Sequence, residues 1–390
     1  MRNLRILALV VATGMIVAAC SSASTAPSGA QPSAQSSVGP GEGEVDLVIW
    51  AGYADASTTD PNDNWVTQFT TDTGCVVKTQ DGTDSANMVQ LMQSGQYDGV
   101  SASGDATLRL IRGGIVAPVN TKLIPNYANV FPGLKGQPHN TVNGVPYGVP
   151  HGRGANLLIY NTNTFKTAPT SWSVVWEANS PAAGKISIYN SAIYIADAAV
   201  YLMKHNPDLK ITNPYELDDA QFTAAVNLLK AQKKIVGEYW SLAASQIESF
   251  ASGSMLAGTT WQYQVNQLAG SPVAATLPEE GSTGWSDTWM ISKTAKHPNC
   301  MYKWMNWIIS PVANAKATVW FGEAPVSQAA CDEAEKISPG HCATYHATDE
   351  NYFKKLYLWN TPSTECGDSR GSVCKDFAAW TAAWTDITGS

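Results

Sequence analysis

The tripeptide Trp285-Ser-Asp287 places an indole and a carboxylate two residues apart. On a strand, residues two apart point to the same face, so these two side chains would lie side by side. Together they suit an organic cation, because each cation–π contact contributes about 0.5–2 kcal/mol and the carboxylate supplies the opposite charge. Trp50, Tyr53 and Trp261 fall at or just after the ends of other expected strands. Core packing explains most single tryptophans, but several at successive strand ends predict a pocket for a small cationic molecule.

The elements that would position these residues alternate between strands and helices. An apolar strand ends at Trp50, a helix is expected over 64–73, and a second strand opens at Cys75. A helix capped by Ser85 then leads to a third strand near Val100. This alternation favours a parallel α/β sheet, in which ligands bind beyond the carboxyl ends of the strands. Four candidate residues lie in the loops there: Trp50, Tyr53, Ser103 and Asp105.

The rest of the chain continues the α/β pattern. Strands are expected within 142–161, 184–188, 253–260, 272–276 and 279–292, and helices over 193–205, 218–235, 243–252 and 298–309. The last of these helices is amphipathic, which predicts that Trp304 and Trp307 belong to the core.

The N-terminal residues read as an export signal. Arg2 and Arg5 precede an apolar run over 6–17, and small residues lead to Cys20, which resembles a bacterial lipobox at 17–20. We therefore expect a lipoprotein signal peptide over 1–19, lipid on Cys20, and anchoring to the outer face of the cell membrane. The alternative is an ordinary secretory signal with an incidental cysteine. Residues 20–44 are rich in Ser, Ala, Pro and Gly without any aromatic residue, which predicts a disordered linker.

Seven cysteines become six once Cys20 is assigned to the lipid. Six cysteines allow 15 pairings. Proximity favours the short loops Cys331–Cys342 and Cys366–Cys374, which leaves Cys75–Cys300 as a long-range bridge. An exported protein meets an oxidising compartment that permits all three disulfides.

Other classes of function find little support. The net charge of −8 disfavours a nucleic-acid binder, which needs a basic face. Zinc is the competing interpretation near Cys342, where His341 and His346 also lie, but the chain has no CxxC and we expect no metal and no cofactor. Residues 367–371 match the G-x-S-x-G pattern, so a secreted hydrolase using Ser369 is an alternative. That motif needs a strand before it and a helix after it, and here it lies in a polar tail.

Several segments together resemble the solute-binding proteins of ABC importers, and most of all the spermidine/putrescine-binding family. The segments are the strand end at Trp50 and Tyr53, 95–98, 144–150 with 160–161, 171–176, the strand end at Trp261, and 285–287. The resemblance covers about 45–330 and implies a receptor rather than an enzyme. It also implies the type II periplasmic-binding fold, with two α/β lobes joined by crossing hinge strands. The lobes would be 45–150 plus 292–390 and 151–291.

The resemblance also implies which residues hold the ligand. Trp50, Tyr53, Trp261 and Trp285 match the family's aromatic contacts, Asp287 matches its amine-binding carboxylate, and Ser103 takes its polar loop position. The implied partners are a small cationic ligand, with a polyamine as the leading class, and the subunits of an ABC permease. We expect a monomer that contacts the membrane only through its lipid and binds no nucleic acid.

Three positions depart from the family's pattern. Tyr194 falls where the family has acidic residues, while Asp105 and Glu323 fall where it has tyrosines. A linear polyamine needs carboxylates near both of its ends, because a buried ammonium without a partner is very costly. Asp105 and Glu323 would restore that arrangement from other walls of the pocket. The alternative is a ligand with a single cationic head, such as a quaternary amine or an amino acid.

Overall fold

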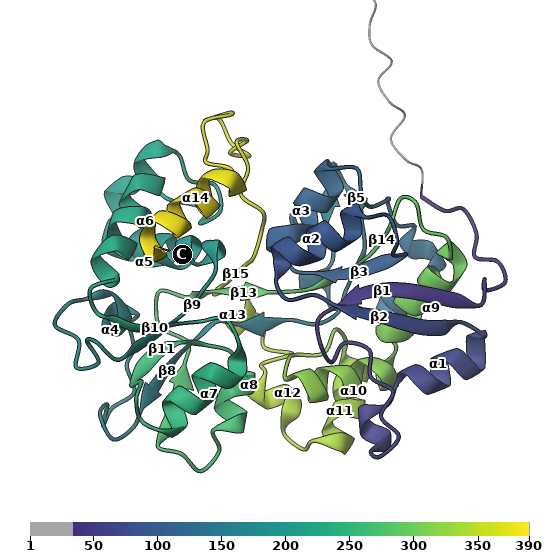
Figure 1. Cartoon of the computed structure of the whole chain (residues 1–390), viewed down its shortest axis with the longest axis horizontal. Helices are drawn as coiled ribbons and strands as arrows, with labels where there is room; N and C mark the ends of the chain where they lie inside the picture. The colour runs from purple at the N-terminus through teal and green to yellow at the C-terminus, as the bar shows by residue number, and fades with distance from the viewer. Residues whose placement is uncertain (1–33, 390) are drawn as a thin grey trace, which may run out of the picture. The chain divides into compact units, whose positions relative to one another are not determined.

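Two five-stranded sheets form the framework of the computed structural model, which describes residues 34–389 (Figure 1). The first sheet has the order β2 (Val76–Asp81), β1 (Glu44–Ile49), β3 (Gly99–Ala102), β14 (Thr288–Ile291) and β6 (Val149–Pro150). β1 pairs in parallel with β2 and β3, and β14 runs antiparallel between β3 and β6. Both faces of β1 are buried, since Leu47 and Val48 belong to two different core clusters. Such burial is typical of a parallel sheet covered by helices on both faces.

Helices on the two faces of this first sheet complete one lobe. α2 (Ser85–Gln93) and α3 (Gly104–Arg112) pack with Val48 through Met88 and Leu110. α1 (Val66–Thr73) and α9 (Pro298–Ile308) pack on the opposite face through Phe69 and Trp304. The same lobe carries the hairpin β4 (Thr141–Val142) and β5 (Val145–Pro146), and the helices α10 (Pro311–Phe321), α11 (Gln328–Ile337) and α12 (His341–Thr344) follow α9.

The second sheet has the order β10 (Val236–Trp240), β9 (Ile186–Tyr189), β11 (Ala257–Thr260), β8 (Leu157–Asn161) and β12 (Val273–Thr276). β9 pairs in parallel with β10 and β11, and β8 runs antiparallel to β11 and β12. The helices of this lobe are α4 (Ser173–Trp176), α5 (Ile195–His205), α6 (Asp219–Gln232), α7 (Ala243–Ala251) and α8 (Gln262–Gln267). Short 3₁₀ turns cover 61–63, 121–123, 125–129, 132–134, 192–194 and 207–209.

A three-stranded sheet lies where the chain passes between the lobes. Its order is β15 (Leu356–Leu358), β13 (Ser282–Trp285) and β7 (Gly154–Ala155), and α13 (Glu350–Phe353) precedes β15. The chain runs from β6 through β7 into β8, and returns from β13 directly into β14 of the first sheet. The predicted two-lobe α/β fold with crossing strands is confirmed.

The sheets place the lobe boundaries differently from the sequence prediction. The predicted second lobe, 151–291, includes β14, yet β14 pairs with β3 and β6 of the first sheet. The predicted first lobe, 45–150 plus 292–390, includes α14 (Phe377–Thr388), yet this helix packs on α6 and on the turn at 192–194 of the second lobe (Figure 1). The correction has a physical reason, because Trp380 and Trp384 of α14 are buried in the core of the second lobe.

The segment before β1 is ordered by contacts with α9. The Gly39 backbone N–H donates to Asn299 Oδ1 at 2.7 Å, and Glu42 accepts from the backbone N–H groups of Asn299 and Cys300, each at 2.9 Å. The predicted disordered linker, 20–44, is therefore wrong for its last part, because Glu42 satisfies the N–H groups at the start of a helix. The predicted signal peptide and Cys20 lie outside the described residues. Within those residues, no helix is long and apolar enough to cross a membrane.

Three disulfides confirm the predicted pairings: Cys75–Cys300, Cys331–Cys342 and Cys366–Cys374. The first ties the start of β2 to α9, and both of its cysteines are fully buried. Because Cys342 is bonded to Cys331, it has no thiolate to offer a zinc ion, which removes the basis of the zinc alternative.

We predict that the disulfide with the longest sequence separation stabilises the protein more than the one with the shortest. Cys75–Cys300 joins residues 225 apart and Cys366–Cys374 joins residues 8 apart, so loop-closure entropy predicts that removing the first costs about 3 kcal/mol more than removing the second. Urea unfolding of the double variants Cys75→Ser/Cys300→Ser and Cys366→Ser/Cys374→Ser measures this difference. Equal losses in the two variants would contradict the prediction.

Candidate functional site

A cavity of about 240 Å³ lies between the two sheets and receives side chains from both lobes. Its walls are Trp50, Ala51, Gly82, Thr83, Ser85 and Ser103 from the first lobe, Tyr189, Ser241, Leu242, Ala243 and Trp261 from the second, and Trp285, Asp287, Phe321 and Trp359. Trp50 follows β1, Ser103 follows β3, and Trp261 follows β11. The cavity therefore lies beyond the carboxyl ends of the strands, where α/β sheets bind ligands.

Asp287 is the carboxylate of this cavity. Its side chain is 3% exposed; the Ser103 hydroxyl donates to Oδ1 at 2.6 Å, and the Tyr53 hydroxyl donates to Oδ2 at 2.7 Å. Burial raises the pKa of Asp287 to about 7, although both hydroxyls lower it. None of the ion pairs among the described residues involves Asp287. A buried carboxylate without a protein counter-ion can accept a cation from outside.

Aromatic rings form the remaining walls. The Trp261 and Trp285 rings meet edge to face, with centroids 6.4 Å apart, and Trp285 meets Phe321 in the same way at 5.9 Å. Tyr189 stacks on Trp359 with an interplanar angle of 8°. The Trp261 indole N–H donates to Asn156 Oδ1 at 2.9 Å, which fixes the ring's position. These rings can hold a cation that has been stripped of water.

A buried cluster supports Asp287 from behind. The Tyr53 ring stacks on His151 with centroids 4.0 Å apart, and the Trp289 indole N–H donates to His151 Nδ1 at 2.9 Å. An Nδ1 that accepts belongs to a neutral imidazole, so Nε2 carries the proton and faces Glu323 Oε1 at 3.2 Å. Burial lowers the pKa of His151 to about 3 and raises the pKa of Glu323 well above its usual range. We therefore describe His151 and Glu323 as a neutral pair and not as an ion pair.

The structure brings five of the predicted residues to the cavity wall: Trp50, Ser103, Trp261, Trp285 and Asp287. Tyr53 lies behind the wall, fully buried, with its hydroxyl on Asp287.

The other three predicted residues lie away from the cavity, which corrects their placement. Asp105 is buried and accepts from the Ser85 hydroxyl at 2.9 Å, and Glu323 faces His151. Tyr194 stacks on Trp176 in the core of the second lobe, with ring centroids 5.5 Å apart. Each of these side chains is buried against a partner in its own lobe, and none of them lines the cavity.

The sequence analysis missed three aromatic wall residues, which are Tyr189, Phe321 and Trp359. Tyr189 ends β9, so the rule that found Trp50 and Trp261 at strand ends would have found it too. Trp359 follows β15, and its backbone N–H donates to the Gly284 carbonyl at 2.7 Å. No local signal marks Trp359, because only the pairing of β15 with β13 brings it to the cavity.

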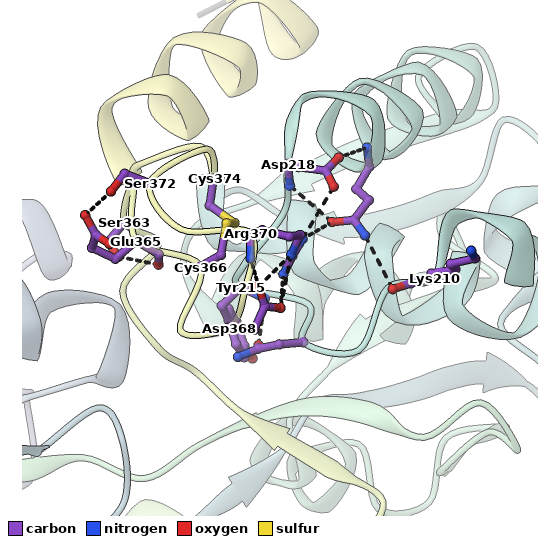
Figure 2. The surroundings of a disulfide bond; sticks show 12 residues. Lys210, Tyr215, Asp218, Ser363, Glu365, Cys366, Asp368, Arg370, Ser372 and Cys374 are labelled. Atoms are coloured by element: carbon purple, nitrogen blue, oxygen red, sulfur yellow. Dashed lines mark hydrogen bonds and ion pairs between the residues drawn. A yellow bond between two sulfur atoms is a disulfide. The ribbon is translucent and has the colours of Figure 1, made fainter.

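The G-x-S-x-G match at 367–371 lies in the loop closed by the Cys366–Cys374 disulfide (Figure 2). Ser369 is exposed, and the loop consists of turns, without the strand and helix that a nucleophile elbow needs. Arg370 holds the loop on the second lobe by pairing with Asp218 at 3.5 Å (Figure 2). It also donates to Gln221 Oε1 at 2.7 Å. The motif therefore serves as a structural loop.

The known proteins that this chain resembles are solute-binding proteins. The family model described as a bacterial extracellular solute-binding protein matches residues 64–344. The spermidine/putrescine-binding periplasmic protein 1 of Haemophilus influenzae is 26% identical over 302 residues, which cover 76% of this chain and 77% of that protein. The putrescine/agmatine-binding protein of Pseudomonas aeruginosa is 24% identical over 298 residues, which cover 71% and 78%.

Solved structures show the same fold. The spermidine/putrescine ABC transporter substrate-binding protein PotD of Streptococcus pneumoniae has a TM-score of 0.68 at 18% identity and covers 88% of this chain and 97% of its own. The lipoprotein TpPotD of Treponema pallidum has a TM-score of 0.70 at 17% identity, covering 88% and 99%. The protein MotA of A. tumefaciens, solved with glucopine, has a TM-score of 0.65 at 16% identity, covering 88% and 99%. The predicted type II periplasmic-binding fold is confirmed, and proteins with this fold bind different solutes.

We predict that Asp287 titrates near pH 7, because burial raises its pKa to about that value. Replacing Tyr53 with Phe removes one donor to the ionised carboxylate and should move the midpoint higher. Carbon-13 NMR of carboxyl-labelled aspartate measures the midpoint, and Asp287→Asn identifies the signal by its loss. A midpoint below about 5, which is close to an ordinary aspartate, would contradict the prediction.

Proposed function

Because the chain belongs to the bacterial extracellular solute-binding protein family, we propose that it is the receptor of an ABC importer for a small organic cation. Proteins of this family are receptors and not enzymes; they capture a solute and deliver it to permease subunits. The proposal concerns which solute this chain takes and which residues hold it.

One observation carries the proposal: Asp287 is a buried carboxylate whose hydrogen-bond partners are two neutral hydroxyls, at the wall of an aromatic cavity. Ionising such a group costs free energy unless a positive charge lies beside it. A bound ammonium would provide that charge, while the faces of Trp285 and Trp261 would replace its water. Tyr53 and Ser103 would keep the carboxylate aimed into the cavity.

The cavity also suggests how binding is coupled to delivery. Its walls come from both lobes, with Trp50 and Ser103 on one and Tyr189 and Trp261 on the other. A ligand that contacts both lobes binds the closed arrangement more tightly than an open one, so it shifts the population toward closure. The permease would then recognise the closed, loaded receptor. The names of the curated relatives support polyamines as one candidate class of ligand.

We predict that isothermal titration calorimetry with putrescine, spermidine, choline and basic amino acids detects a one-to-one complex with at least one cation. Asp287→Asn should weaken binding by about 30-fold or more, since it removes one partner of a buried charge pair. Trp285→Ala should also weaken it, because the ring face is lost. Tyr194→Phe is the control, since Tyr194 lies in the core of the second lobe and the variant should bind like the parent protein.

Thermal unfolding of each variant checks that the fold is intact. The receptor proposal fails if none of these cations binds, and the assignment of Asp287 fails if Asp287→Asn binds as the parent does.

We further propose that the protein is tethered to the outer face of the cell membrane by lipid on Cys20. Metabolic labelling with a radioactive fatty acid should label the parent protein and leave Cys20→Ser unlabelled and released into the medium or periplasm. Release of the parent protein without label would contradict the tether and favour an ordinary secretory signal.

A further inference from the structure

A second space of about 230 Å³ lies next to the ligand cavity. The two spaces share five wall residues, which are Ala51, Ala243, Trp261, Trp285 and Phe321. The second space adds Tyr263, Trp320 and Gly322, and we call it the tail chamber. Because five residues line both spaces, the two spaces lie side by side, and a single elongated ligand would be long enough to reach from one to the other.

The tail chamber differs chemically from the space around Asp287. Among the described residues, its wall contains neither a carboxylate nor a basic side chain, and five of its eight residues are aromatic: Trp261, Tyr263, Trp285, Trp320 and Phe321. Apolar surface of this kind favours apolar groups by about 0.8 kcal/mol for each buried methylene. The chamber is thus suited to the apolar part of a ligand.

Two large apolar side chains that line these spaces are also exposed. Trp320, at the end of α10, is 40% exposed, and its ring packs so closely on Gly52 that a Cβ there would overlap it. Leu242, which precedes α7 in the second lobe and lines the first space, is 67% exposed. Such exposure is unfavourable in the free protein, and an apolar ligand tail in the tail chamber would cover Trp320, which lines that chamber.

A second carboxylate for the far end of a polyamine is missing from these walls. Asp287 is the one carboxylate that lines either space within the described residues. Asp105 accepts from Ser85, and Arg109, one turn further along α3, opposes its charge. Glu323 faces His151 behind the wall. A diamine long enough to reach the tail chamber would bury its second ammonium there without a counter-ion, which is costly.

Resting on the proposed receptor function, we propose that the ligand is a monocationic amphiphile: one ammonium head on Asp287 and an apolar alkyl or aryl tail in the tail chamber. The receptor then ranks monoamines above diamines of the same length.

Matched amines test this ranking by calorimetry on the full protein. Hexylamine and 1,6-diaminohexane have the same carbon chain and differ only in the second amine. Hexylamine should bind at least tenfold more tightly, and affinity should rise about fourfold for each methylene from butylamine to hexylamine. A diamine that binds as tightly as hexylamine, or more tightly, overturns this inference and leaves the receptor proposal intact. Absence of binding by all amines, polyamines and quaternary amines overturns both.

A charge placed in the tail chamber provides the second test. Trp320→Glu should weaken the binding of hexylamine and strengthen the binding of 1,6-diaminohexane, because the new side chain supplies the missing carboxylate. Val312→Glu is the matched control: Val312 lies on the same helix, is 52% exposed and lines neither space, so this variant should keep the parent's ranking. If both variants shift the ranking equally, the effect comes from net charge and the inference is overturned. Thermal unfolding confirms that each variant is folded.

Discussion

A buried carboxylate that has no counter-ion among residues 34–389 is the constraint on which the candidate site depends. Asp287 is held by the hydroxyls of Tyr53 and Ser103, and its other neighbours are aromatic rings and the neutral pair of His151 and Glu323. Hydroxyl donors orient the charge without neutralising it. A carboxylate in this state has room for an external cation, which is the property that the proposed receptor for cations needs.

The crossing strands explain why this carboxylate lies between the lobes. β13 ends at Trp285 in the three-stranded hinge sheet, and β14 begins at Thr288 in the first lobe, so Asp287 lies in the short connection. β15 pairs with β13 in the same sheet and delivers Trp359 to the cavity. The strands that join the lobes thus also carry cavity-facing side chains, so under the proposed function a ligand in the cavity would bias the angle between the lobes.

The sequence predicted those features that local pattern determines. Trp50 and Trp261 were found because the carboxyl ends of parallel strands meet at one edge of a sheet, and the disulfides were found because short loops favour local pairs. Trp359 was missed because its position follows from pairing between strands that are distant in sequence. Asp105 and Glu323 were misplaced because the choice between ligand and protein partner is made by tertiary packing against Ser85 and His151. No spacing rule encodes that choice.

The most direct test of the central claim is a crystal structure of the protein with a bound organic cation. The account predicts one cationic nitrogen beside the Asp287 carboxylate, within about 6 Å of the ring centroid of Trp285 or Trp261, with the remainder of the ligand directed toward Trp320. A ligand whose nitrogen lies elsewhere, with Asp287 still contacting only Tyr53 and Ser103, would contradict it.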